Sequence, residues 1–240
     1  MAGLSVIYRH SLATRILHWV NALCVFLVLM SGLQILNAHP RLYWGQYGAN
    51  TDQAFIQFPL GPGGKAFPPW ITIPGWQDLA SGRRWHFFFA WILVGNSILY
   101  LLVSFARGHV RRDLLPARAE LSGRHIACEL WNHLRLKFPA GEAAKRYNTL
   151  QKLTYLVVIF MLAPMMLLTG LTLSPGMDAA VPWLVDLFGG RQSARTLHFL
   201  TAMLIAAFII VHLLMVLLAG PVNELRSMIT GRFLIRERVR

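Results

Sequence analysis

Four histidines lie within or at the start of long apolar stretches, where an ionisable side chain is costly and usually functional. They are His18, His86, His198 and His212. A neutral imidazole can bind a transition metal or carry a proton. A single histidine in such a stretch can also form a plain hydrogen bond between helices, so the spacing of the group has to decide.

His198 and His212 are 14 positions apart in one apolar stretch. In a helix this interval is just under four turns, so both side chains share one face and lie roughly 21 Å apart along the axis. His86 is then expected at the depth of His198, and His18 at the depth of His212. A zinc site would need three or four ligands at one depth, and a proton relay would not need two matched pairs. The pattern predicts two stacked b-type haems, each with an imidazole on both faces of its iron.

The elements that position these histidines are four apolar stretches, each about as long as the 20 residues that cross a bilayer as a helix. The predicted spans are residues 16–36, 85–105, 153–173 and 197–219. Hydrophobic residues make up 55% of the 240 and charged residues only 14%, with a mean hydropathy of +0.48. These values predict an all-α integral membrane protein, a four-helix bundle in a single cytochrome b domain over residues 1–240.

Basic residues set the expected orientation. Of the 23 lysines and arginines, ten lie in the loop of residues 106–152, five in the C-terminal tail and two before the first span. The positive-inside rule therefore predicts that both termini and this loop are cytoplasmic, in a multi-pass protein of the bacterial inner membrane. The net charge of +13 is explained by this distribution and not by nucleic-acid binding.

The two long loops differ in character. Residues 126–138 of the cytoplasmic loop carry apolar side chains at helical spacing among Arg and His, which predicts an amphipathic helix on the lipid surface. The outer loop, residues 37–84, combines many aromatic residues with Gly and Pro. It could dock a partner or form an aromatic belt at the membrane interface, and the sequence does not choose between the two. Cys24 and Cys128 show no disulfide or haem-attachment pattern and are expected to be packing residues.

Cationic residues near the histidine pairs could hold haem propionates, which are anionic. Arg84 and Arg195 lie near the predicted outer pair, and Arg15 lies near the inner pair. Gly32 follows His18 by 14 positions, so the first helix would present bare backbone at the depth of the outer haem, where a porphyrin could pack. Gly170 could act similarly in the third helix. The rival to His86 as outer ligand is His39, which stands just beyond the first span and directly before a proline.

Three motifs carry a resemblance to a known family. They are Arg15-Ile16-Leu17-His18-Trp19, Arg84-Trp85-His86, and Thr196-Leu197-His198 together with His212. With these, the chain resembles the prokaryotic cytochrome b561 superfamily, and more narrowly the cytochrome b subunits of formate dehydrogenase (gamma subunit) and nickel-iron hydrogenase. The segments 37–45 and 188–195 look like a subgroup often paired with molybdopterin oxidoreductases.

The resemblance implies an electron-transfer subunit that connects a periplasmic redox partner with the quinone pool. The partner would be a molybdopterin oxidoreductase or a c-type cytochrome. The inner haem would face a quinone near the cytoplasmic surface. Candidate residues at that end of the bundle are His10, Arg15, Tyr147, Asn148 and Gln151. The long aromatic outer loop departs from the hydrogenase and formate dehydrogenase types, so the partner stays open.

Two other functions are kept beside this one. A free-standing haem oxidoreductase could couple quinone to a small outer substrate such as superoxide or ferric iron. A non-redox transporter or scaffold could use its histidines for protons. No loop carries a catalytic cluster, because Asp52, Asp78, Asp178 and Asp186 are scattered. Haem spectra would separate the third function from the first two, and copurification of a partner would separate the first from the second.

Overall fold

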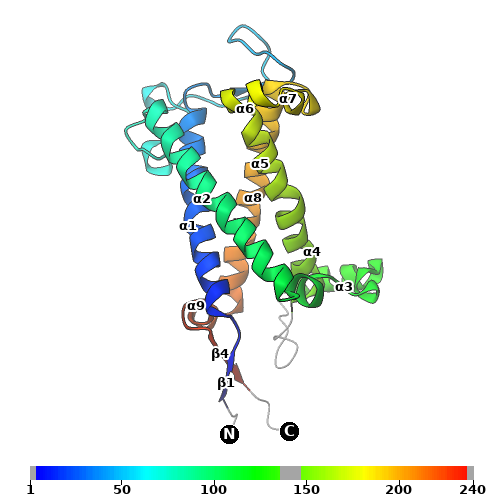
Figure 1. Cartoon of the computed structure of the whole chain (residues 1–240). Helices are drawn as coiled ribbons and strands as arrows, with labels where there is room; N and C mark the ends of the chain where they lie inside the picture. The colour runs from blue at the N-terminus through cyan, green and yellow to red at the C-terminus, as the bar shows by residue number, and fades with distance from the viewer. Residues whose placement is uncertain (1–3, 136–146, 237–240) are drawn as a thin grey trace. The chain divides into compact units, whose positions relative to one another are not determined.

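The computed structural model describes residues 4–135 and 147–236, and these residues are mostly helical (Figure 1). The longer elements in chain order are β1 (Leu4–Tyr8), α1 (Leu12–Leu36), β2 (Arg41–Leu42), β3 (Ile56–Gln57), α2 (Leu79–Ala106), α3 (Gly123–Leu134), α4 (Thr149–Val157), α5 (Ala163–Thr172), α6 (Pro175–Ala180), α7 (Trp183–Leu187), α8 (Arg191–Ala219), α9 (Pro221–Thr230) and β4 (Arg232–Arg236). Short 3-10 turns cover Pro62–Gly64, Pro69–Ile71 and Arg118–Leu121, and π-helical turns cover Val110–Leu114 and Val158–Leu162.

The predicted all-α membrane class is confirmed. Four helices in the described part of the chain are long and apolar enough to cross a membrane: Leu12–Leu36, Leu79–Ala106, Thr149–Thr172 and Arg191–Ala219. Each begins four to six residues before its predicted start, because polar capping residues open a helix that hydropathy alone does not detect. Ser11 Oγ accepts from Thr14 N before α1, and the Asp78 carboxylate accepts from Ala80 N and Ser81 N at the start of α2.

The third membrane helix is interrupted at its centre. A π-helical turn, Val158–Leu162, separates α4 from α5. Pro164 stands in the first turn of α5, where it lacks the N–H that would donate to the carbonyl four residues earlier. The wider turn accommodates the missing hydrogen bond, as π-turns do within longer helices.

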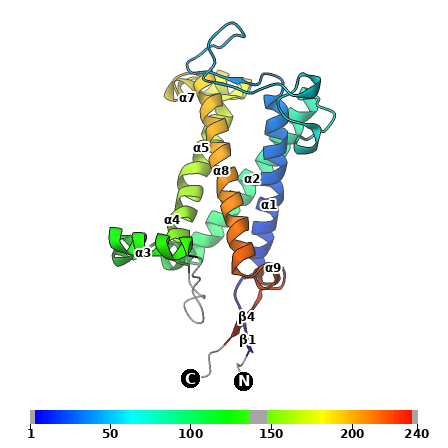
Figure 2. The same ribbon diagram turned by 180° about the vertical axis from the view of Figure 1, so that it is seen from behind.

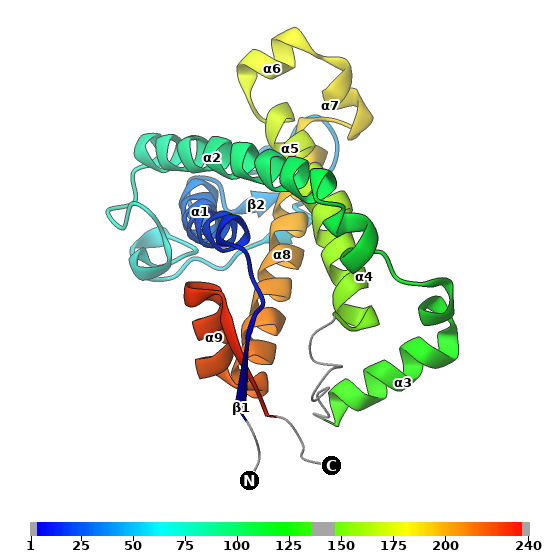
Figure 3. The ribbon, with the colours of Figure 1, turned by 60° about the horizontal axis from the view of Figure 1, so that its bottom comes forward.

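The described chain divides into two compact units. Unit 1 comprises Met1–Trp19, Ile98–Met161 and Ala206–Arg240, and unit 2 comprises Val20–Ser97 and Leu162–Ile205. In unit 1, β1 and β4 pair as antiparallel strands, and α9 packs against β4 (Figure 2). The same unit holds α3, which lies against α4 (Figure 3). An ion pair between Lys152 Nζ and Glu120 Oε2, at 2.9 Å, connects the start of α4 with the segment before α3.

Helix α3 matches the predicted amphipathic helix, although it starts three residues earlier. Leu130 and Trp131 are more than half exposed, as expected for side chains that face lipid. Phe138 of the predicted stripe lies outside the described residues. Cys128 is exposed on this helix, so its prediction as a packing residue was wrong, whereas Cys24 is buried. Both thiols are free.

In unit 2, the segment after α1 is held against the first turn of α8. Gly190, at φ +109°, lies so close to the backbone that an added Cβ would stand 2.6 Å from the carbonyl of Gly45. Gln192 N and Ser193 N both donate to Gly45 O, and Gly45 N donates to Ser193 Oγ. The two segments that carried the narrower resemblance therefore pack against each other directly.

The aromatic outer loop contains both packed and exposed rings. Phe58 contacts Phe67 and Phe199 at ring distances of 5.4 and 5.3 Å, which fixes the loop to α8. Tyr47, Trp70 and Trp76 are about three-quarters exposed or more. Part of this loop is thus a small core, and the remaining rings are available to lipid or to a partner.

Candidate functional site

The predicted outer pair is brought together within unit 2. The imidazoles of His86 on α2 and His198 on α8 have ring centres 6.2 Å apart and planes at 66°. The two rings are not in stacking contact at this distance. The space between them could hold one atom, with an imidazole on either side of it.

Each ring of the outer pair is held by the same local arrangement on a neighbouring helix. His86 Nδ1 lies 3.2 Å from Ser31 Oγ and 3.0 Å from Val28 O on α1. His198 Nδ1 lies 3.0 Å from Thr169 Oγ1 on α5, and the ring also has a hydrogen bond with the backbone of Met166. In both helices the hydroxyl residue follows the carbonyl residue by three positions and precedes a glycine.

These contacts determine which nitrogen of each ring is available. A carbonyl oxygen only accepts, so the bond to Val28 O requires the proton of His86 on Nδ1. Thr169 Oγ1 donates its one proton to Met165 O at 2.6 Å and therefore accepts from His198 Nδ1. Both imidazoles then have Nε2 unprotonated on the opposite edge of the ring, the form that binds a metal, with ligand orientation fixed from the second shell.

The glycines complete this arrangement. A Cβ added to Gly32 would lie 3.5 Å from His86 Cε1, and one added to Gly170 would lie 3.2 Å from His198 Cε1. Gly32 was predicted to present bare backbone against which a porphyrin could pack. In the structure this backbone faces the ring of His86, one of the predicted iron ligands. The residue pairs Ser31-Gly32 and Thr169-Gly170 are the sequence signal that could have identified these supporting residues in advance.

The predicted inner pair is brought together within unit 1. The ring centres of His18 on α1 and His212 on α8 are 6.5 Å apart, again with planes at 66°. His18 also contacts the Trp19 ring, whose Nε1 donates to Met228 O at 3.1 Å. On the other side, Phe208 stacks on His212 at 5.9 Å.

Both distances fit a metal bound between two imidazoles. A metal–nitrogen bond of about 2.0–2.1 Å places each ring centre roughly 3.2 Å from the ion, and the two centres about 6.4 Å apart. The observed values are 6.2 and 6.5 Å. Within the described part of the chain there is no group of three or more His, Cys, Asp or Glu side chains that could hold a metal ion. Two facing imidazoles of this kind are a donor set that could hold a haem iron.

Buried donors without a partner add to this fit. Arg15 stands three residues before His18, and its Nε is buried without a hydrogen-bond partner among the described residues. Arg195 stands three residues before His198, and its guanidinium donates to the carbonyls of His39 and Arg41. The Nε2 of His39 is buried and likewise has no partner in the described structure. A buried donor without a partner, such as Arg15 Nε, is expected to meet an acceptor, and a propionate carboxylate is of the right kind.

The other candidates are placed as follows. Arg84 Nη2 donates to Ser81 Oγ at 3.0 Å on the exposed side of α2. His39 stacks on Tyr43 at 5.7 Å and is not paired with His198. Burial, followed by the charges of Arg195 and Arg41, lowers the pKa of His39.

The residues predicted to line a quinone site divide into two groups, all within unit 1. Asn148 and Gln151 cap α4: Gln151 N donates to Asn148 Oδ1, and Asn148 N donates to Gln151 Oε1. Tyr147 lies between the rings of His109 and Tyr155, and burial raises its pKa to about 12. Burial, together with the positive charges of Arg9 and other neighbours, lowers the pKa of His10 to about 4.

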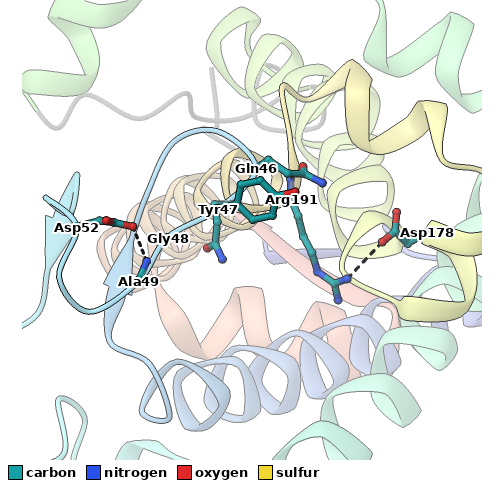
Figure 4. A pocket seen from close by; sticks show the side chains of 8 residues that line it. Gln46, Tyr47, Gly48, Ala49, Asp52, Asp178 and Arg191 are labelled. Atoms are coloured by element: carbon teal, nitrogen blue, oxygen red, sulfur yellow. Dashed lines mark hydrogen bonds and ion pairs between the residues drawn. The ribbon is translucent and has the colours of Figure 1, made fainter.

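A pocket of about 560 Å³ lies in unit 2 where the outer loop meets α6 and α8 (Figure 4). Arg191 Nη1 pairs with the Asp178 carboxylate at 3.4 Å on one side, and the Asp52 carboxylate accepts from Ala49 N on the other. Tyr47 borders the same space. Sequence reasoning treated the aspartates as scattered and did not identify this pocket, because its residues come from three separate segments.

Comparison with known proteins identifies the family of the chain. A family model described as prokaryotic cytochrome b561 matches residues 9–231. The chain belongs to this family. A protein of Azospira oryzae named "Putative protein-methionine-sulfoxide reductase subunit YedZ1" is 30% identical over 217 residues, which cover 90% of this chain and 93% of the relative. The chain is thus a membrane cytochrome of the b type, with haem as its cofactor and electron transfer as its activity.

Proposed function

We propose that this cytochrome binds two b-type haems, one between His86 and His198 and one between His18 and His212, and connects a redox partner with the quinone pool. The observation that carries the proposal is the ring-centre distance, 6.2 Å in one pair and 6.5 Å in the other. Two pairs of matching geometry in two separate units favour two haems over one.

The bound haems would supply iron centres that accept and release one electron each. The protein's own part is to hold four imidazoles with Nε2 available and to satisfy the propionates. For the outer pair, Ser31 and Thr169 fix the rings through Nδ1. Arg15 with its free Nε, and Arg195 beside His39, are the donors we assign to the propionates.

The orientation and the partner belong to the same proposal. The distribution of basic residues favours a cytoplasmic location for both termini, so the outer pair and the pocket around Arg191 and Asp178 would face the periplasm. The relative from Azospira is named as a subunit of a protein-methionine-sulfoxide reductase. We therefore propose a periplasmic redox subunit as partner, with reduction of oxidised methionine as the first activity to test.

The ligand assignment is tested by haem content and by reduced-minus-oxidised spectra of the purified full-length protein. We expect two haems b per chain. His198→Ala and His86→Ala should each lose the same haem, and His18→Ala and His212→Ala should lose the other. His39→Ala tests the rival outer ligand. It should retain both haems, because it removes at most a propionate contact and no iron ligand.

One haem per chain would reject the two-haem proposal. Loss of the outer haem in His39→Ala with retention in His86→Ala would reject the ligand assignment alone. The partner is tested separately: mixing with quinol and the candidate sulfoxide reductase should produce turnover that neither protein shows by itself.

A further inference from the structure

A row of aromatic rings in unit 1 connects the inner pair with the end of the unit that carries His109. His212 stacks on Phe208, and Phe208 meets Tyr155 at 6.3 Å. Tyr155 contacts Tyr147 at 5.6 Å, and Tyr147 contacts His109 at 6.4 Å. Each ring in the row therefore contacts the next, and the row ends at a histidine, a residue type that can accept and release protons.

His109 is oriented by a carboxylate. Its Nδ1 lies 2.6 Å from Asp113 Oδ2, one helical turn later. The pair spans the π-helical turn Val110–Leu114, which packs against α4, the helix that begins just after Tyr147. Because Asp113 holds Nδ1, the free Nε2 is the atom available for proton exchange.

The pair stands between the partly buried Tyr147 and water. The His109 side chain is 31% exposed and that of Asp113 is 49% exposed. A proton taken up at Nε2 can therefore reach solvent without crossing the membrane interior. The charged and titratable groups around the pair, from the start of α1, the end of α2, the π-turn and the segment before α4, are Arg9, His10, Arg107, Arg111, Arg112 and Tyr147.

These surroundings are mainly cationic. Arg107 donates to Ser11 Oγ at the cap of α1, and Arg112 donates to the carbonyl of Arg107. The Asp113 carboxylate is the only acidic group in the π-turn. The Asp113 carboxylate, which contacts Nδ1, orients the His109 ring so that Nε2 is presented for proton exchange.

We propose that His109, oriented by Asp113, is the proton-exchanging residue of a quinone site that borders Tyr147. The inference rests on the proposed quinone reaction and adds its proton route. Oxidation of a quinol breaks two O–H bonds and releases two protons and two electrons. His109 Nε2 accepts one proton and passes it to water, and the second proton follows by the same route. A haem held by the histidine pairs would supply the acceptor for the two electrons, one at a time. Quinone reduction runs the same steps in reverse.

The test uses the full-length haem-loaded protein and a short-chain quinol. The rate of haem reduction is followed by absorbance between pH 5 and 9. Loss of quinol protons to a general base is favoured at higher pH, so the wild-type rate should rise with pH. His109→Gln should lower the rate at pH 7 about 100-fold, the scale of general-base catalysis, and remove this rise. Asp113→Asn should lower it about tenfold through the same residue.

The matched control is His125→Gln. His125 also belongs to unit 1, pairs with a carboxylate one helical turn later, Glu129 at 3.4 Å, and is 42% exposed. It should leave both the rate and the pH profile unchanged. Reduction by dithionite should give the same haem spectrum in every variant, which shows that the haem ligands are intact.

The outcomes separate the two levels of inference. If quinol does not reduce the wild-type haems while dithionite does, the proposed quinone reaction fails and the proton route fails with it. If quinol reduces the wild type and His109→Gln equally, with the same pH profile, only the role of His109 is overturned. An equal loss in His125→Gln would also overturn it, since the effect would then not depend on the row of rings.

Discussion

Substitution of the two glycines that face the outer pair gives a matched test of the site geometry. Gly32→Ala would place its Cβ 3.5 Å from His86 Cε1, an ordinary van der Waals distance. Gly170→Ala would place its Cβ 3.2 Å from His198 Cε1, so the ring has to move by a few tenths of an ångström. The same substitution therefore adds a methyl group at an ordinary contact distance from His86 and at a shorter than ordinary distance from His198.

The magnitudes follow from two opposing terms. Alanine in place of glycine favours a helix by about 0.5–1 kcal/mol, which applies at both positions. Overpacking a tight contact costs roughly 1–3 kcal/mol, which applies only at Gly170. We expect Gly32→Ala to be neutral or slightly stabilising. Gly170→Ala should weaken retention of the outer haem by about 1 kcal/mol, which is about fivefold.

The assay is the loss of the outer haem to an excess of an external haem acceptor, followed by absorbance in detergent. His86→Ala serves as the reference, because under the proposed ligand assignment it would lack this haem. Equal rates of haem loss in the two alanine variants would refute the reasoning, as would faster loss from Gly32→Ala than from Gly170→Ala. Either result would show that the contacts of these glycines do not govern ligand position.

Three further predictions concern other parts of the chain. Gly190→Ala should separate the outer loop from α8, because the added Cβ would lie 2.6 Å from the Gly45 carbonyl and residue 190 has a left-handed backbone conformation. We expect partner-dependent turnover to fall, whereas the haem spectra should stay as in the wild type. The pKa of His10 is lowered to about 4 in the folded protein, against 6.5 for an ordinary histidine, so the unfolded chain binds more protons between these two pH values. The thermal stability of the protein should therefore fall as the pH drops from 6.5 to 4. His10→Gln should make the melting temperature depend less on pH in this range. The hydrogen bond from Lys152 lowers the pKa of Glu120, and Glu120→Gln should destabilise the protein by about 0.5–1 kcal/mol in thermal unfolding, with less effect at high salt.

The sequence by itself determined the membrane class, the four spans and the candidate ligands. Apolar stretches of sufficient length have one stable form in lipid, the helix, since it satisfies its own backbone hydrogen bonds. Helix periodicity then places His198 and His212 on one face, so the choice of four histidines needed no coordinates. The exact helix starts were not accessible in this way, because Ser11 and Asp78 cap α1 and α2 through contacts that hydropathy does not record.

Tertiary structure decided which groups support and surround the histidines. Ser31 and Thr169 are marked in the sequence only by the glycine that follows each of them. Packing of α1 against α2, and of α5 against α8, is what brings their hydroxyls to Nδ1 of the rings. The same holds for Tyr147 and His109, which are 38 positions apart in the sequence and meet at 6.4 Å. Spacing along one helix predicts which side chains share a face, whereas contacts between distant segments depend on register and rotation that no local pattern specifies.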